Sequence, residues 1–203
     1  PLGSAAGYGA ASLPLDRDAT AAELGFAEVQ SPVTAVQLSR GKAEAQLLLE
    51  ITLVMQDLGR LASDLLLFYT QEFAFVALPD AFTTGSSIMP QKRNPDVFEL
   101  VRGRTASAHG CLVEALGIFA KLPSGYQRDL QLLKFPLFRG IDLCTQTLDI
   151  MASAIAQVRF VPERIHLDPA IHAAEQAYAL VAKEGIPFRE AYRRIGAALK
   201  PKK

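Results

Sequence analysis

The feature that most constrains the fold is a long proline-free segment with helical periodicity. No proline occurs between Pro32 and Pro79. Within this segment apolar residues recur three and four positions apart, as one buried helix face requires, at Leu47, Ile51, Val54, Met55, Leu58, Leu61, Ala62 and Leu65. We therefore predict a helix over residues 34–69, roughly three times the average length of about 11–12 residues. Such a helix needs other long helices to cover its apolar face, so the pattern predicts a helical bundle.

A second long helix is expected over residues 94–119. Asn94 is a suitable N-cap, and Pro95 fits the first helical position because its missing N–H would have no partner there. One face of this helix is apolar. A second face carries Glu99 followed at helical spacing by the small residues Gly103, Ala106 and Gly110. Small side chains let another helix come close, which predicts a tight helix contact beside Glu99.

The remaining segments complete an all-α fold with two domains. We predict a helix over residues 129–157 bent near Pro136, short helices over 20–24, 170–183 and 188–199, and a short hairpin over 73–78. Residues 1–160 are expected to form part of a central helical-bundle domain. Residues 161–203 are expected to form a small C-terminal helical domain.

Composition and charge limit the class of protein. The 21 basic and 21 acidic side chains give a formal net charge of zero, so no general attraction to nucleic acid or an anionic membrane is expected. Charged residues interrupt the apolar stretch 47–69, and the sequence has no signal peptide, which predicts a soluble cytoplasmic protein. Cys111 and Cys144 lie far apart in apolar helical patterns, so we expect neither a disulfide nor a zinc site. No cluster has the spacing of metal ligands, and no metal is expected.

The segment 70–95 interrupts the helices and holds the candidate chemistry. A connection of about 26 residues without helical pattern is more often functional than idle. Residues 83–96 read Thr-Thr-Gly-Ser-Ser-Ile-Met-Pro-Gln-Lys-Arg-Asn-Pro-Asp. Successive backbone N–H groups at Gly85-Ser86-Ser87, the positive end of the next helix and the Lys92 charge are the parts of an anion site. A solvated surface loop has the same composition, and composition alone does not separate the two.

The order of these residues resembles the signature segment of the fumarase/aspartase/argininosuccinate lyase superfamily. That segment has glycine, two serines, Met-Pro, lysine and Asn-Pro in this register. Gln91, Lys92, Arg93 and Asp96 make the argininosuccinate lyase branch the most similar. The resemblance extends over nearly the whole chain, through residues 1–4, 15–17, 23–26, 122–134 and 185–191. Residues 1–4 also match an expression-vector scar; we expect them to be native, because the family pattern continues after them.

The resemblance implies an activity and a set of roles. Enzymes of this branch cleave argininosuccinate to arginine and fumarate by β-elimination. By motif position Ser86 would be the base, activated by loop N–H groups and Lys92, while Glu99 would orient a catalytic histidine. Lys92 and Asn94 would hold the carboxylate that takes up negative charge. Elimination with proton transfer needs no cofactor, and none is expected. Substrate contacts are implied for Ser87, Asn94, Tyr126, Gln131 and Lys134.

Part of the family's machinery is missing from this chain. The family's polypeptide is more than twice as long, and its N-terminal domain and the Thr-His pair that supplies the histidine are absent. His109 lies ten residues after Glu99, about 15 Å along a helix, and is expected to pack or cap. His166 and His172 are expected at the surface. We predict that the chain alone is inactive, and that other subunits of a homotetramer or the missing N-terminal part complete the site.

Two other interpretations remain open. One is another superfamily lyase, such as adenylosuccinate lyase, fumarase or aspartase, which a panel of substrates would separate. The other is a structural protein on the same fold, since the family includes relatives recruited as lens crystallins. Binding of argininosuccinate without turnover by the full-length protein would favour the structural role.

Overall fold

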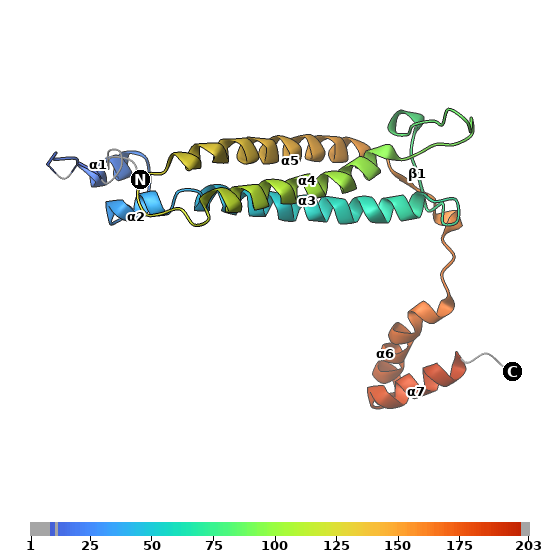
Figure 1. Cartoon of the computed structure of the whole chain (residues 1–203). Helices are drawn as coiled ribbons and strands as arrows, with labels where there is room; N and C mark the ends of the chain where they lie inside the picture. The colour runs from blue at the N-terminus through green and yellow to red at the C-terminus, as the bar shows by residue number, and fades with distance from the viewer. Residues whose placement is uncertain (1–8, 11, 200–203) are drawn as a thin grey trace. The chain divides into compact units, whose positions relative to one another are not determined.

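The computed structural model describes residues 9–10 and 12–199. The chain divides into two compact units: the first ends at Phe160 and the second begins at Val161 (Figure 1). The predicted all-α fold is confirmed, because the two described strands have only two residues each. The segment at residues 1–4 lies outside the described residues.

Three long helices form the body of the first unit. They are α3 (Lys42–Tyr69), α4 (Asp96–Phe119) and α5 (Lys134–Ile155), and they lie side by side in Figure 1. Their apolar faces meet in two clusters: one contains Leu48, Met55 and Cys111, and the other Leu65, Phe98 and Met151. Each fully buried large side chain contributes roughly 1.5–3 kcal/mol, so these clusters hold the bundle together.

Glycines allow close contact between these helices. A Cβ on Gly59 of α3 would lie 2.6 Å from Cγ2 of Thr105 on α4. A Cβ on Gly140 of α5 would collide with Leu48 of α3. The contact predicted at the small face of α4 is different: Gly103 and Gly110 have nothing within 4 Å of an added Cβ and are exposed. No described helix covers that face, so the predicted close packing there is wrong within the described chain.

The predicted single helix over residues 34–69 is also wrong, because the chain turns at Gly41. A short helix α2 (Val33–Leu38) comes first, and α3 starts after Gly41, whose φ of 89° lies in the left-handed region. The Glu44 side chain accepts a 3.0 Å hydrogen bond from the Gly41 N–H. Absence of proline therefore permitted a continuous helix without requiring one, since glycine can leave the helical conformation at no steric cost.

Three other boundaries differ from the prediction. Pro95, not Asn94, is the N-cap of α4. The expected hairpin is absent: β1 (Val76–Ala77) pairs antiparallel with β2 (Arg159–Phe160), far along the chain. The helix predicted over residues 129–157 is split into a 3-10 helix η2 (Arg128–Leu133) and α5, so Pro136 lies in the first turn of α5. Proline is tolerated there because the first-turn N–H groups have no intrahelical partner.

The shorter elements complete the two units. In the first unit, α1 (Arg17–Glu23) begins after Asp16, which accepts a hydrogen bond from the Ala19 N–H, and a 3-10 helix η1 (Asp80–Phe82) precedes the signature loop. The second unit contains η3 (Pro162–Arg164), η4 (Pro169–His172), α6 (Ala173–Glu184) and α7 (Phe188–Ala198). Phe188 stacks on Tyr178 with ring centroids 5.3 Å apart. None of the described helices has the length and apolar character needed to cross a membrane.

Candidate active site

The signature loop, residues 85–93, is closed at its base by an isolated bridge. Thr84 N–H donates to Asn94 O at 2.9 Å, and Asn94 N–H donates to Thr84 O at 2.8 Å. The Thr84 hydroxyl also donates to the carboxylate of Asp96, the first residue of α4. The bridge fixes both limbs of the loop to the start of α4. It also explains why Asn94 is not the helix cap, because its backbone is engaged with Thr84.

Ser86 lies at the start of a tight turn in this loop. Its Oγ accepts hydrogen bonds from the backbone N–H groups of Ile88 and Met89, both at 3.2 Å. A second turn follows, in which Lys92 N–H donates to Met89 O at 3.0 Å. Two N–H groups directed at one hydroxyl oxygen would stabilise a negative charge on that oxygen. This is the arrangement that the resemblance implies for the base.

A cleft of about 880 Å³ lies between the end of α3, the signature loop and the start of α4. Three predicted site residues line it: Lys92, Asn94 and Glu99. Two residues that sequence reasoning missed line it as well, Tyr69 and Arg102. Positional signals existed for both, because Tyr69 ends the helix before the loop and Arg102 follows Glu99 by three residues. Arg93 lines the cleft too, and its three cations, Lys92, Arg93 and Arg102, together with the Asn94 amide are suited to binding carboxylates.

Tyr69 is in an electrostatically perturbed position at this cleft. Burial raises its pKa above the usual 10.0, the carboxylate of Asp80 raises it further, and Arg93 opposes both effects. Arg93 Nε is 3.4 Å from Asp80 Oδ1. Tyr69 therefore stays neutral at ordinary pH and offers the cleft a hydroxyl that can donate or accept a hydrogen bond.

The other predicted substrate contacts lie at the opposite end of the bundle. Tyr126 is half exposed, and Arg40 lies over its ring, 5.1 Å from the centroid. Gln131 is in η2 and Lys134 begins α5, and both are exposed. The α4 helix separates this end from the cleft by about 36 Å at 1.5 Å per residue. One chain therefore does not bring these three residues to Lys92, Asn94 and Glu99.

Ser86 and Ser87 lie on the signature loop but do not line the cleft. Ser86 is half-buried and Ser87 is exposed. Both serines remain within a few residues of Lys92, on the same closed loop. The structure thus groups five of the eight predicted site residues at the loop end of the bundle, namely Ser86, Ser87, Lys92, Asn94 and Glu99.

His109, the histidine of the first unit, does not line the cleft. His109 Nδ1 is 2.8 Å from Thr105 O, and its Nε2 is 2.7 Å from Nε2 of Gln56 on α3. The Thr105 carbonyl requires a proton on Nδ1, which leaves Nε2 to accept from Gln56. His109 therefore connects α3 to α4 by a hydrogen bond. His172 pairs with Glu175 at 3.2 Å in the second unit, and His166 is exposed.

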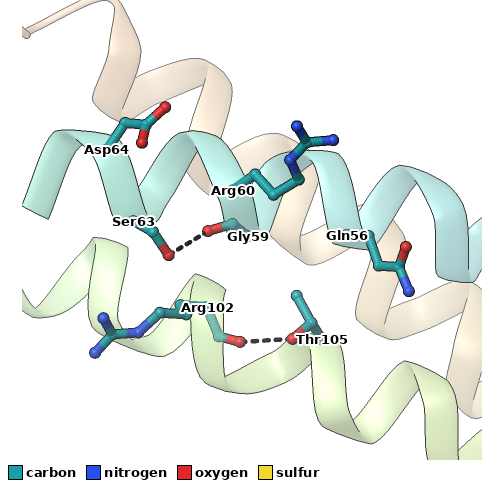
Figure 2. Close-up of a pocket in the computed structure, with 7 residues that line it drawn as sticks. All are labelled: Gln56, Gly59, Arg60, Ser63, Asp64, Arg102 and Thr105. Atoms are coloured by element: carbon teal, nitrogen blue, oxygen red, sulfur yellow. Dashed lines mark hydrogen bonds between the residues drawn. The ribbon is translucent and has the colours of Figure 1, made fainter.

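A second groove, of about 480 Å³, runs along α3 and α4 beside the Gly59–Thr105 contact (Figure 2). Figure 2 shows the Ser63 and Thr105 hydroxyls turned back onto their own helices, where they donate to Gly59 O at 2.8 Å and Arg102 O at 2.7 Å. Arg102 lines both the groove and the cleft. Cys111 and Cys144 are free, buried thiols. Among residues 9–10 and 12–199, no three His, Cys, Asp or Glu side chains are grouped as metal ligands.

Comparison with known proteins agrees with the class that the helical bundle and the loop motif define, a lyase. Residues 1–110, more than half of the chain, match the family model described as "Lyase". The chain therefore belongs to this lyase family, the fumarase/aspartase superfamily.

Similar proteins cover nearly the whole chain. An argininosuccinate lyase from Sorangium cellulosum (strain So ce56) is 50% identical over 98% of this chain and 46% of its own length. An argininosuccinate lyase from Xanthomonas campestris pv. campestris (strain B100) is 47% identical over 98% of this chain and 46% of its own. A crystal structure of EDDS lyase in complex with formate superposes with a TM-score of 0.71 at 28% identity, covering 97% of this chain and 39% of that one. The chain thus spans about half the length of the curated relatives it matches.

Proposed function

We propose that this chain is part of an argininosuccinate lyase, which cleaves argininosuccinate to arginine and fumarate in the cytoplasm. The signature loop and the names of the relatives at 50% and 47% identity support this substrate. The single observation that carries the proposal is the loop geometry: the Ser86 hydroxyl accepts two backbone N–H bonds, at 3.2 Å each, six residues before Lys92.

In the proposed reaction Ser86 acts as an alkoxide base. It removes the proton from the carbon beside a substrate carboxylate, and the electron pair left on that carbon delocalises into the carboxylate. The N–H groups of Ile88 and Met89 lower the cost of the alkoxide because they already point at Oγ. The carbon–nitrogen bond then breaks, fumarate forms, and the leaving nitrogen takes a proton from an acid.

Lys92 and Asn94 bind the carboxylate that takes up charge during this step. Both line the cleft, and the Lys92 ammonium is a compact cation that can sit beside two oxygens. Glu99, on the first turn of α4, faces the same cleft. It holds the catalytic histidine in one tautomer, and that histidine is supplied by another segment or chain.

The remaining contacts come from another copy of the chain. The arginine part of the substrate is bound by Tyr126, Gln131 and Lys134. These residues lie about 36 Å from the cleft of their own chain. A homotetramer in which the far end of one copy meets the loop end of another resolves this separation. We expect the chain alone to be inactive, because none of the described residues that line the cleft is a histidine.

The experiment joins this chain to the part of the Sorangium cellulosum relative that it does not align with. The fusion is assayed for argininosuccinate cleavage by the ultraviolet absorbance of fumarate, beside adenylosuccinate, malate and aspartate. We expect turnover of argininosuccinate alone, and a loss on the order of 10³-fold in kcat for Ser86→Ala, as removal of a base predicts. Turnover of another substrate in the panel, or argininosuccinate binding without cleavage, would contradict the proposal.

A further inference from the structure

Arg93 has contacts inside the signature loop that the proposed roles do not explain. We infer that Arg93 is a positioning residue: its guanidinium, oriented by Asp80, ties the Ser86 limb of the loop to the Lys92 limb and fixes the two residues relative to each other. The catalytic part of this inference rests on the proposed function. Its structural part rests on the loop alone.

The guanidinium binds the limb that carries Lys92. Nη1 of Arg93 donates to the carbonyl oxygens of Pro90 and Lys92, both at 3.2 Å. These carbonyls lie on either side of Gln91, so the two bonds fix the end of the turn that begins at Met89. A planar guanidinium suits this task, because its donors point in fixed directions and each can hold a separate acceptor.

The same group lies near the limb that carries Ser86. Nη1 of Arg93 is 4.0 Å from the position that a Cβ on Gly85 would take, and among the described residues other than Gly85's chain neighbours no other heavy atom lies within that range. Gly85 directly precedes Ser86. The guanidinium thus bonds the Lys92 limb and lies close to Gly85 of the Ser86 limb, at a second place beyond the Thr84–Asn94 bridge where the two limbs approach each other.

The loop has little else to hold its shape. Its two large apolar side chains are not buried: Ile88 is 87% exposed, and Met89, which lines the cleft, is 44% exposed. With so little apolar packing, the conformation depends mainly on polar contacts within the loop. Arg93 bonds the Pro90 and Lys92 carbonyls and lies beside Gly85, so we expect its removal to free the turn that presents Ser86.

Asp80 orients the guanidinium from outside the loop. Its Oδ1 accepts from Nε of Arg93 at 3.4 Å, which leaves Nη1 directed at the loop carbonyls. The pair is exposed, and such a pair contributes little to stability by itself. The effect of the Asp80–Arg93 pair is therefore to set the direction of the guanidinium. Because Tyr69 responds electrostatically to both Asp80 and Arg93, the same contacts connect the loop to the end of α3.

The structural test is hydrogen exchange on the chain itself. We expect Arg93→Met to speed exchange about tenfold at the N–H groups of Ile88, Met89 and Lys92, which are the donors of the two loop turns. Arg93→Lys should slow it again in part, because one ammonium can replace one of the bonds. Arg194→Met is the matched control, since Arg194 also makes two side-chain bonds, to Glu184 and Glu190, but in the second unit. Unchanged exchange in Arg93→Met would overturn the inference.

The catalytic test uses the same variants in the active fusion protein. Misplacement of a reacting group by about 1 Å can cost roughly 10²-fold, so Arg93→Met should lower kcat by about 10–100-fold while KM changes less. Arg93→Lys should recover part of kcat, and Arg194→Met should change neither constant. A normal kcat in Arg93→Met overturns the catalytic part. An inactive parent fusion overturns the proposed function, and hydrogen exchange then still decides the role of Arg93 in the loop.

Discussion

The two ends of the three-helix unit hold their functional residues in different ways. At the loop end, Ser86 and Lys92 are placed by backbone turns whose large apolar side chains, Ile88 and Met89, are not buried. At the far end, Gly41 packs tightly against Phe119, and Tyr126 lies under Arg40. Residues predicted for one site are divided between these ends, about 36 Å apart. The difference teaches that residues which a motif predicts for one site need not meet in one chain.

The largest expected effect is a change in activity when a variant of the loop end is mixed with a variant of the far end. In the active fusion protein, Lys92→Met and Lys134→Met should each lower kcat/KM by about 10²–10³-fold, since each loses a charge that binds or stabilises the substrate. If the two ends of different copies share a site, mixed assemblies of the two variants have intact sites. Random mixing predicts about one quarter of the parent activity, because both required segments are intact in one site of four.

Denaturation and joint refolding of the two variants is the measurement, followed by the fumarate assay. Refolding each variant alone is the control and should leave activity low. Equally low activity in the mixture would contradict the assembly of one site from two copies.

Alanine at two glycines compares the packing of the two ends. Gly41 has φ 89°, and a Cβ there would lie 2.6 Å from Phe119, so Gly41→Ala should cost about 2–4 kcal/mol in the free energy of unfolding. A Cβ on Gly85 would meet only Arg93 Nη1, at 4.0 Å. Gly85→Ala should therefore change stability by less than about 0.5 kcal/mol. Urea denaturation of both variants measures the difference, and equal losses would show that the loop end is packed as tightly as the far end.

His109 lies between the two ends and is expected to serve neither. His109→Leu removes the bonds to Gln56 and Thr105 and should lower the free energy of unfolding by about 0.5–1.5 kcal/mol. In the active fusion kcat should stay unchanged, because the proposed reaction takes its histidine from another segment. A large fall in kcat with a small fall in the free energy of unfolding would show instead that His109 takes part in the reaction.

Local sequence patterns predicted the helices well. The apolar spacing located α3 but only part of its buried face: Ile51, Met55, Ala62 and Leu65 are buried and Leu58 is half-buried. Leu47, Val54 and Leu61 of the same pattern are exposed, and the fully buried Leu48 was not part of it. The pattern failed where tertiary structure decided. Gly41 could have continued a helix, but it adopts a left-handed conformation and the helix is interrupted there. Phe119 packs against Gly41, and the Glu44 side chain accepts a hydrogen bond from its N–H. The strand at Val76 found its partner at Phe160, and no local pattern encodes a pairing over that separation.

The candidate site was predictable where its residues are close in sequence. Lys92, Asn94 and Glu99 share one cleft because the loop leads directly into α4. Tyr69 and Arg102 were missed, because their approach depends on how α3 lies against α4. The division of the site between two ends follows from helix length: a helix of 24 residues carries Tyr126 away from Lys92 however well the motif is matched.

The smallest expected effect concerns Tyr69 at the loop end. Burial and Asp80 raise its pKa in the folded chain above 10.0, while Arg93 lowers it. Between pH 10.0 and that raised value the folded state retains a proton that the unfolded state has lost, so the contribution of Tyr69 to stability is complete below pH 10.0 and declines as pH rises. Tyr69→Phe should make the free energy of unfolding fall less steeply in this range.

The difference in phenolate absorbance between parent and variant should give a pKa for Tyr69 above 10.0. In Arg93→Met the pKa of Tyr69 should be higher still, because the opposing positive charge is gone. An unshifted Tyr69 pKa in Arg93→Met would show that the guanidinium does not act on the end of α3, and would restrict its effect to the loop itself.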